Sequence, residues 1–210
     1  MRDRIFAFMV ERLGVEDAAL ARDLWTVAFR RFNQSLRGLR ACGYAFDTDE
    51  YWRFIRGDSA RFLSPAPHDE VGALLRSLNE AGVRCWIVTN CREREAVEAL
   101  HALNLDPSLF KGVLGSDAMG DVCKPELAAF ERVVALTGCD PAATVMFEDS
   151  LKNLVTAKAM GMRTVLVGGA TAAEEGGGHT LLGATVDAQV ETCGLDAVRA
   201  ALPQLWPQRG

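Results

Sequence analysis

Two adjacent carboxylates follow a short apolar run in the second half of the chain. Val145, Met146 and Phe147 form the run, and Glu148 and Asp149 come directly after it. Such a run suits a strand that is buried on both faces of a parallel sheet, and open α/β sheets bind ligands at the carboxyl ends of their strands. Adjacent carboxylates repel each other unless a cation or a proton intervenes, so a hard metal such as Mg²⁺ is their natural partner.

Groups that suit an anion occur at two earlier points of the chain. Thr89 and Asn90 end the apolar run Val83–Val88 and offer a hydroxyl and an amide. Lys124 precedes Pro125, which we place at the first position of a helix, so an ammonium and free backbone N–H groups could face the same anion. A cation, hydrogen-bond donors and a metal site at one sheet edge are what phosphoryl transfer requires, because its transition state spreads negative charge.

Each of these pieces also has a structural interpretation. Thr89 and Asn90 could form a turn, and Lys124 could be a solvated surface lysine. Glu148 and Asp149 could belong to an acidic loop in which an Asp or Ser caps the next helix. Singly, these interpretations are the better ones, but the three pieces in this order favour a phosphoryl-transfer site.

An alternation of strands and helices is expected to position these groups. Apolar runs predict strands, and apolar residues at helical spacing predict helices. The predicted strands are 83–88, 113–116, 145–147, 163–167 and 186–190, and the predicted helices are 68–81, 93–103, one that opens at 125 and runs through 134, one that ends at 160, and 195–202. This alternation predicts an α/β fold with a doubly wound parallel sheet and right-handed crossovers.

The first part of the chain has a different pattern, which predicts helices alone. One helix should stop at Gly14, a second should cover 17–31, and a third should start at Asp47 as its N-cap. Five aromatic residues are expected to form a small helical core rather than a base-stacking surface: Trp25, Phe29, Phe32, Tyr44 and Trp52. Because the prolines of Ser64-Pro65-Ala66-Pro67 interrupt both helices and ladders, we predict an all-helical lobe over residues 1–62 and an α/β core over residues 63–210.

Composition limits the function classes. The 210 residues are 49% hydrophobic and 24% charged, as in ordinary globular proteins, and the net charge of −5 argues against nucleic acid or an anionic membrane as main partner. The six cysteines contain no C-x-x-C pair, and the N-terminus lacks the apolar core of a signal peptide. We therefore expect a reduced, cytoplasmic protein without structural zinc. Gly176-Gly177-Gly178 follows two glutamates and is interpreted as a flexible surface loop rather than a phosphate loop.

Together, the three motifs resemble those of the haloacid dehalogenase-like hydrolase superfamily. Val88-Thr89-Asn90 resembles its second motif, which binds the transferring phosphoryl group, and Lys124-Pro125 resembles its third, whose lysine steadies nucleophile and phosphate. Phe147-Glu148-Asp149-Ser150 resembles the fourth, acidic motif, which binds magnesium. The resemblance implies that Thr89, Asn90 and Lys124 are catalytic and phosphate-binding residues. It also implies that Mg²⁺ is bound by Asp149, with Glu148 alongside or acting through water.

Finer details resemble one branch of this superfamily. Phe8–Gly14, Ser35–Leu39 and the segment around Phe46-Asp47 are similar to the pyrimidine 5′-nucleotidase-like group, which carries a helical cap between its first and second motifs. That group removes phosphate from nucleoside monophosphates such as UMP and CMP. The resemblance therefore implies that residues 1–62 are the cap and that the substrate is a small phosphate ester of this class.

The chain departs from the family at the nucleophile. The family's first motif, Asp-x-Asp-x-(Thr/Val), ends the first, central strand and supplies an aspartyl-phosphate nucleophile and a general acid–base. Asp47-Thr48-Asp49 has no apolar strand before it, and Asp3 follows only two residues, so neither replaces that motif. We therefore expect the first central strand to be missing, roughly twenty upstream residues to be absent, and this chain to have negligible phosphatase activity.

Two other functions compete with the phosphatase. A non-catalytic protein could keep the fold for binding or regulation, but it would not need Thr89, Lys124 and the paired acids. A carbon–halogen hydrolase of the same family would not need the metal, so Glu148 and Asp149 count against it.

Overall fold

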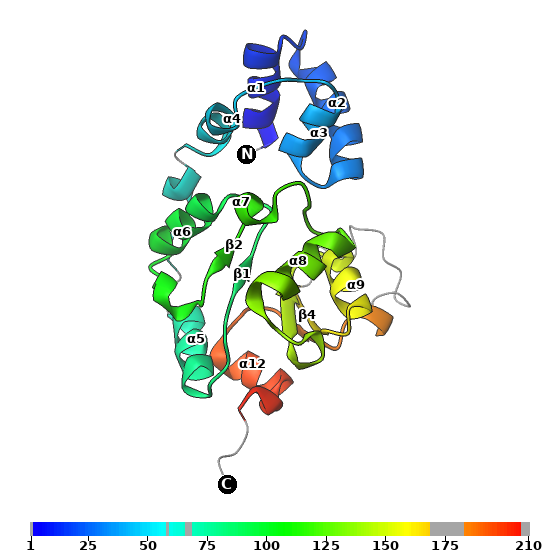
Figure 1. Ribbon diagram of the computed structural model, residues 1–210. Coiled ribbons are helices and arrows are strands. Elements are labelled where there is room, and N and C mark those ends of the chain that lie inside the picture. Colours follow the sequence, from blue (N-terminus) through cyan, green and yellow to red (C-terminus); the bar gives the residue numbers. More distant parts are fainter. Residues whose placement is uncertain (1, 58, 66–68, 169–182, 207–210) are drawn as a thin grey trace. The chain divides into compact units, whose positions relative to one another are not determined.

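The computed structural model describes residues 2–57, 59–65, 69–168 and 183–206 (Figure 1). The chain divides into two compact units, residues 1–64 and 65–210, and we describe each by itself. The predicted loop at Gly176-Gly177-Gly178 lies outside the described residues.

Unit 1 is built from helices in its described part. They are α1 (Arg2–Leu13), α2 (Ala18–Phe32), α3 (Ser35–Ala41), α4 (Thr48–Arg56) and the 3₁₀ turn η1 (Ser59–Phe62). Asp17 caps α2, and Asp47 caps α4 as predicted, accepting a hydrogen bond from the Glu50 N–H at 2.7 Å. The positive φ of Gly14, 72°, ends α1 at the predicted residue. Helix α3 was not predicted, because its seven residues contain no long apolar pattern.

The core of unit 1 is aromatic. Phe8 is fully buried, and its ring meets Phe46, Tyr51 and Phe54 edge-on with centroids 5.1–5.5 Å apart. Of the five aromatic residues expected in this core, Trp25 and Trp52 are buried in it and Phe29 and Tyr44 pack against it. Phe32 does not belong to this cluster; it lies at the last position of α2, where the Arg31 guanidinium covers its ring.

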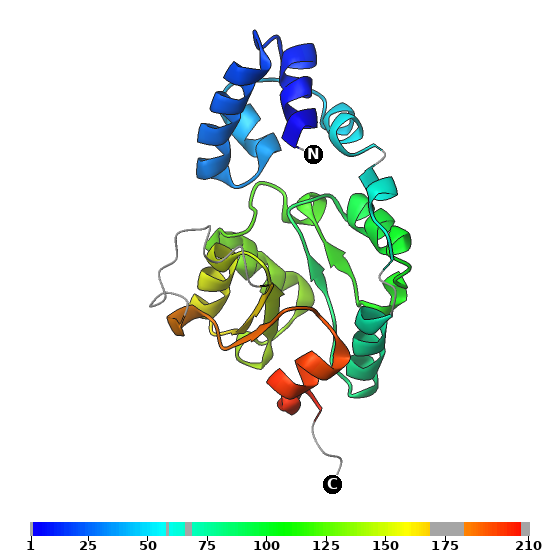
Figure 2. The ribbon, with the colours of Figure 1, turned by 180° about the vertical axis from the view of Figure 1, so that it is seen from behind.

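Unit 2 is an α/β unit with parallel strands, as predicted. The strands are β1 (Ile87–Val88), β2 (Val113–Leu114), β3 (Val145–Glu148), β4 (Arg163–Val167) and β5 (Ala188–Val190). They form two sheets, β1–β2 and β3–β4–β5, and all strand pairs are parallel. Within the described part of unit 2, no ladder joins β1 to β3. The two sheets lie side by side in both views (Figures 1 and 2).

The backbone bonds show which edges of the sheets are open. Alternate residues around β1 bond toward β2: the Cys85 carbonyl with Lys111 N–H, Ile87 N–H with the Gly112 carbonyl, and Thr89 N–H with the Leu114 carbonyl, at 2.8–3.1 Å. Since the backbone groups of neighbouring strand residues point to opposite sides, those of Trp86 and Val88 point away from β2. Next to β3, the Thr144 carbonyl points toward β4, because it accepts the Arg163 N–H. By the same alternation, the backbone groups of Val145 and Phe147 point away from β4.

Helices cover both faces of the sheets. They are α5 (Glu70–Glu80), α6 (Glu93–Ala102), α7 (Ser116–Met119), α8 (Leu127–Thr137), α9 (Leu151–Ala159) and α12 (Leu195–Ala201), with 3₁₀ turns η2 (Pro107–Leu109), η3 (Pro141–Ala143) and η4 (Pro203–Leu205). Residues of α5 and α12 pack on one face, against Val145, Phe147 and Val165. On the other face, α8 and α9 pack against Met146. Helices on both faces define a doubly wound architecture.

On each face of unit 2, the helices contact both sheets and so span the unpaired edges of β1 and β3. On one face, Cys85 beside β1 and Phe147 of β3 pack against the same cluster of α5 and α12 residues. On the other face, α8 contributes Val133 to the cluster that contains Val88, and Phe130 to the cluster that contains Met146. The halves of unit 2 are therefore held together by helices, while their strands remain unpaired with each other.

Two local predictions were wrong. Pro125 does not start a helix: it follows a cis peptide bond after Lys124, and α8 begins at Leu127 behind the N-cap residue Glu126. The strand predicted over 83–88 is regular only at Ile87–Val88. A strand that pairs along only one edge, with the two-residue strand β2, has few ladder bonds to extend it.

Candidate active site

Three side chains from three segments meet in one chain of contacts. The Asn90 amide pairs with the backbone of Lys124, donating to its carbonyl at 2.9 Å and accepting from its N–H at 3.0 Å. The Lys124 ammonium donates to Glu148 Oε2 at 2.6 Å. Asn90 follows β1 and Glu148 ends β3, so Lys124 links the carboxyl ends of two strands that no ladder connects.

The loop that carries Lys124 is fixed from two sides. Besides the Asn90 amide, Thr156 of α9 donates its hydroxyl to the Pro125 carbonyl at 2.7 Å. Thr89 accepts the Cys91 N–H at 3.1 Å and keeps its own hydroxyl proton as a donor. The sequence suggested Asn90 as a contact for anionic oxygens, whereas in the structure its amide positions the lysine.

The ion pair between Lys124 and Glu148 is largely shielded from water, with side-chain exposures of 11% and 9%. Burial alone would raise the pKa of Glu148, but hydrogen bonding from Asp149 and the charge of Lys124 outweigh burial and lower it. The pKa of Asp149 is raised, first by its hydrogen bond with Glu148 and then by burial and the Glu148 charge. The paired acids therefore hold a proton more readily than two isolated carboxylates would.

The helix-cap interpretation of this stretch is not what the structure shows. Ser150 is the N-cap residue of α9, but its side chain makes no capping hydrogen bond. Instead, Glu148 Oε1 accepts the N–H groups of Asp149 and Ser150 at 3.2 and 3.3 Å. Both oxygens of Glu148 are thus occupied, one by the lysine and one by the start of the helix, and the exposed carboxylate is that of Asp149.

The donor set fits Mg²⁺ only in part. Oxygen donors suit this ion, and Asp149 and Glu148 supply two carboxylates. One of them is tied to Lys124 at 2.6 Å, and no group of three or more His, Cys, Asp or Glu side chains within the described ranges is placed to bind a metal. The described residues do not complete a magnesium site.

Replacing Asp149 with Asn should make the chain more resistant to urea at pH 7 in EDTA. The raised pKa means that the Asp149 contribution to stability is present below the ordinary Asp range and is lost as pH rises through the shifted value. The depressed pKa of Glu148 acts in the opposite direction, because its contribution is lost as pH falls. Asp149→Asn should therefore raise the unfolding midpoint at pH 7 and leave it nearly unchanged at pH 4. An unchanged midpoint at pH 7 would contradict this electrostatic account.

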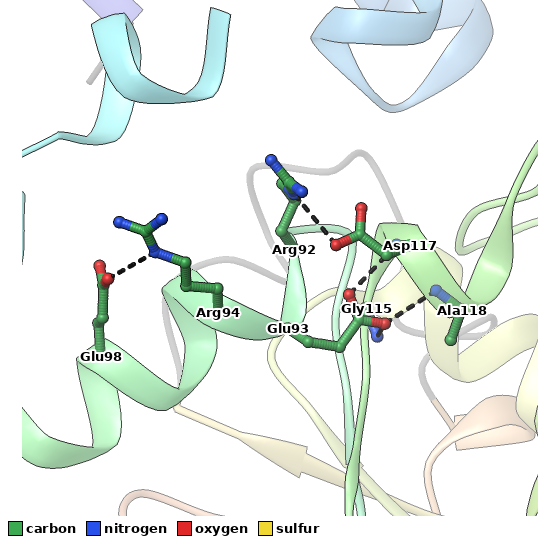
Figure 3. Close-up of polar contacts among 7 residues, drawn as sticks. All are labelled: Arg92, Glu93, Arg94, Glu98, Gly115, Asp117 and Ala118. Carbon is green, nitrogen blue, oxygen red and sulfur yellow. Dashed lines mark hydrogen bonds and ion pairs between the residues drawn. The ribbon is translucent and has the colours of Figure 1, made fainter. Parts of the chain in front are cut away.

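A second carboxylate clamps the neighbouring loop (Figure 3). Glu93, the first residue of α6, accepts the N–H groups of Gly115, Asp117 and Ala118 at 2.7, 3.2 and 2.9 Å. Burial by itself would raise the pKa of Glu93, but these N–H donors lower it. Arg92 donates to Asp117 at 3.1 Å beside this clamp. The loop after β2 is therefore fixed against the segment that follows Thr89.

Gly115 allows the backbone of the loop after β2 to lie close to the backbone of residues 91–93. A Cβ at this position would lie 2.5 Å from the Cys91 carbonyl oxygen and 2.7 Å from the Glu93 nitrogen. Gly115→Ala should therefore lower the free energy of unfolding by about 1–3 kcal/mol, as overpacking does. Gly183→Ala is the matched control, because nothing lies within 4 Å of its Cβ. Urea unfolding of both variants measures the difference in the free energy of unfolding. Equal midpoints would contradict the prediction, because the loop would then have moved to make room for the added Cβ.

Sequence reasoning missed the residues that position others. Glu93 was only the first residue of the predicted helix 93–103, and nothing local indicates that it accepts hydrogen bonds from a segment more than twenty positions away. Thr156 was likewise an ordinary helix residue in the sequence. Only three-dimensional contacts identify such roles, whereas Thr89, Lys124 and the paired acids could be found because each follows or precedes an element boundary.

Comparison with known proteins identifies the class. The model of the haloacid dehalogenase-like hydrolase family, described as a hydrolase family, matches residues 5–161. Because this match covers most of the chain, and the fold and the three motifs agree with it, the chain belongs to the haloacid dehalogenase-like hydrolases. The match supports the α/β fold and the family that the sequence resembles.

Curated proteins that the chain is similar to include proteins named as phosphatases. The chain is 32% identical over 157 residues to a phosphoglycolate phosphatase of Neisseria gonorrhoeae, covering 74% of this chain and 60% of the relative. It is 30% identical over 96 residues to the sesquiterpene phosphatase astK of Aspergillus oryzae, covering 46% of this chain and 48% of that relative. The chain spans about half of the length of these curated relatives, from 47% to 60%.

Solved structures show the same fold at low identity. The crystal structure of a putative β-phosphoglucomutase from Thermotoga maritima superposes with a TM-score of 0.58 at 21% identity, covering 95% of this chain and 91% of that one. A dehalogenase superposes with a TM-score of 0.57 at 17% identity, covering 99% and 82%. Within the described residues, no helix is long and apolar enough to cross a membrane.

Proposed function

We propose that this chain carries the phosphate-handling part of a phosphomonoester hydrolase. The observation that carries the proposal is the contact chain from Asn90 through Lys124 to Glu148, because it places a fixed ammonium at the carboxyl edge of both sheets. An ammonium held there can stabilise the charge that builds up on a transferring phosphoryl group. The Thr89 hydroxyl, at the end of the segment that leads through β1, is the further donor for its oxygens.

We propose that the nucleophile comes from a further strand, outside those that the structure describes. The support is the pair of open edges on β1 and β3, which leaves a strand position beside Lys124. A carboxylate at the end of such a strand would attack phosphorus and form an acyl phosphate, with the substrate alkoxide as leaving group. Lys124 would then lie between that carboxylate and Glu148. The chain by itself is proposed to be inactive.

Mg²⁺ is the proposed cofactor, with Asp149 as direct ligand and Glu148 alongside or acting through water. Asp149 is exposed, and its pKa is raised by the neighbouring Glu148, so a cation would relieve the repulsion between the two. When bound, the ion would neutralise charge on the phosphoryl oxygens. The incomplete donor set described above is consistent with a third carboxylate supplied by the added strand.

The substrate is proposed to be a small phosphate ester, a nucleoside 5′-monophosphate such as UMP or CMP. The helical unit of residues 1–64 is proposed to act as the cap that selects the leaving group, on the strength of its resemblance to the pyrimidine nucleotidase group. Phosphoglycolate is the second candidate, since three of the curated relatives are named for it.

Hydrolysis assays can test the proposed function. The 210-residue chain would be compared with the same chain extended at its amino end by a strand that finishes in Asp-x-Asp-x-Thr and a short loop. UMP, CMP and phosphoglycolate would be supplied with Mg²⁺, and phosphate release would be measured. Turnover is expected only in the extended chain, and it should be lost with Lys124→Ala or with Asn at the first added Asp. An extended chain that folds and binds Mg²⁺ but releases no phosphate would refute the proposed function.

A further inference from the structure

The segment that leads from β2 to Lys124 is held at both of its ends. At its start, three backbone N–H groups bond the Glu93 carboxylate, which points toward them (Figure 3): those of Gly115, Asp117 and Ala118. At its end, the backbone of Lys124 pairs with the Asn90 amide. Glu93 and Asn90 are three residues apart, so one short stretch of chain fixes both ends of the segment.

Helix α7, which opens this segment, depends on Glu93 for its first turn. The helix has four residues, and its N-cap residue Gly115 has no side chain that could accept from the free N–H groups of the first turn. A single helical turn is not stable alone, so contacts from outside the turn must hold it. Glu93 supplies such contacts at 2.7–3.2 Å and so caps a helix that cannot cap itself.

The stretch between α7 and Lys124 is short and packed. Residues 120–123 connect the two, and Cys123 is buried beside Lys124, as Met119 is at the end of α7. A displacement of α7 is therefore transmitted to the Lys124 backbone rather than absorbed by a loose loop. The ammonium meets Glu148 at 2.6 Å in a pair that is largely shielded from water. A shielded ion pair is favourable only with good geometry, so it tolerates little displacement of its backbone.

We propose that Glu93 is a positioning residue for Lys124: by capping α7, its carboxylate sets the place from which the ammonium reaches Glu148. The bonds of Glu93 go to backbone N–H groups, so it acts on the ammonium through the backbone. Its effect on the pairing of Lys124 stands on these contacts alone, whereas its effect on catalysis rests on the proposed function.

Lysine acetylation measures how well the Lys124 amine is shielded. The 210-residue chain would be treated briefly with acetic anhydride, and acetylation of Lys124 and Lys158 would be quantified by peptide mass spectrometry. Lys158 is the internal reference, because it is also paired, with Asp187, but is 38% exposed against 11% for Lys124. Glu93→Ala should raise the acetylation rate of Lys124 relative to Lys158 at least about tenfold, because three charge-assisted hydrogen bonds are lost.

Two further variants make the result specific to Glu93. Glu93→Gln keeps one oxygen that can accept from Gly115 and Ala118, which share Oε1, and loses the bond from Asp117, so its rise should be real but smaller. It also carries the test if Glu93→Ala does not fold. Glu98→Ala removes another carboxylate of α6, which is exposed and bonds Arg94 at 2.9 Å (Figure 3), and should leave the ratio unchanged. An unchanged ratio in a folded Glu93 variant, or equal rises at both lysines, would overturn the proposal.

Steady-state kinetics of the extended chain separate the positioning role from the proposed function. Glu93→Ala should lower kcat at least about tenfold and change KM less than about twofold, because a displaced ammonium stabilises the transition state less. Full turnover in this variant would overturn the positioning role. An extended chain without turnover, together with a raised acetylation ratio in Glu93→Ala, would leave the positioning of Lys124 intact and count only against the proposed function.

Discussion

Replacing Lys124 with methionine should lower the free energy of unfolding by about 3–5 kcal/mol at pH 7. The substitution keeps most of the side-chain volume but leaves the Glu148 carboxylate, which is 9% exposed, without its cation. Removing one partner of a buried ion pair is costly because the remaining charge is uncompensated. Urea unfolding monitored by circular dichroism measures the loss.

Three comparisons make this result specific to the ion pair. Lys111→Met, at an exposed lysine of the same unit, should change the stability by less than about 0.5 kcal/mol. Adding Glu148→Gln to Lys124→Met should restore part of the loss, because the stranded charge is removed. The loss should also shrink as the pH falls, since Glu148 is then protonated and its depressed pKa no longer contributes. A Lys124→Met variant as stable as the parent at pH 7 would contradict the pairing.

Replacing Phe8 with alanine should destabilise unit 1 by about 3–5 kcal/mol. Phe8 has no exposed surface, and three aromatic rings surround it with centroids 5.1–5.5 Å away, so truncation leaves a cavity in the middle of the helical core. Trp25, whose indole N–H donates to Ser35 Oγ at 2.8 Å, belongs to this unit. Its indole NMR signal, followed through urea unfolding, measures the loss.

The matched control is another phenylalanine of the same unit. Phe62 is 72% exposed, so Phe62→Ala should change the unfolding midpoint little. Equal effects of the two substitutions would mean that the aromatic cluster around Phe8 does not form the core of unit 1.

The alternation of apolar runs and helical patterns was sufficient to predict the fold class. The strand over 163–167 was predicted at its observed ends, and Asp47 was predicted as the N-cap of α4. Both are set by local chemistry: an apolar run between a glycine turn and Gly168, and a carboxylate that can bond the first turn of a helix. The family resemblance was confirmed by the match over residues 5–161.

Features set by distant contacts could not be predicted in this way. The length of β1 depends on how many of its edges are paired. The residues Val83–Val88 carry no local signal that distinguishes a strand with one partner strand from a strand with two. Pro125 fits a helix start by local rules, yet the Asn90 amide and the Thr156 hydroxyl hold its loop in another conformation. The roles of Asn90 and Glu93 as positioning residues likewise come from partners more than twenty residues away in sequence.

Residue-resolved amide exchange of the 210-residue chain tests the central claim, that β1 and β3 are each paired along one edge only. The account predicts alternation along both strands. Fast-exchanging N–H groups should be those of Trp86, Val88, Val145 and Phe147, and slow ones those of Ile87, Thr89, Met146 and Glu148. Uniform protection along β1 and β3 in the monomeric chain would contradict it, because both strands would then be paired on two edges.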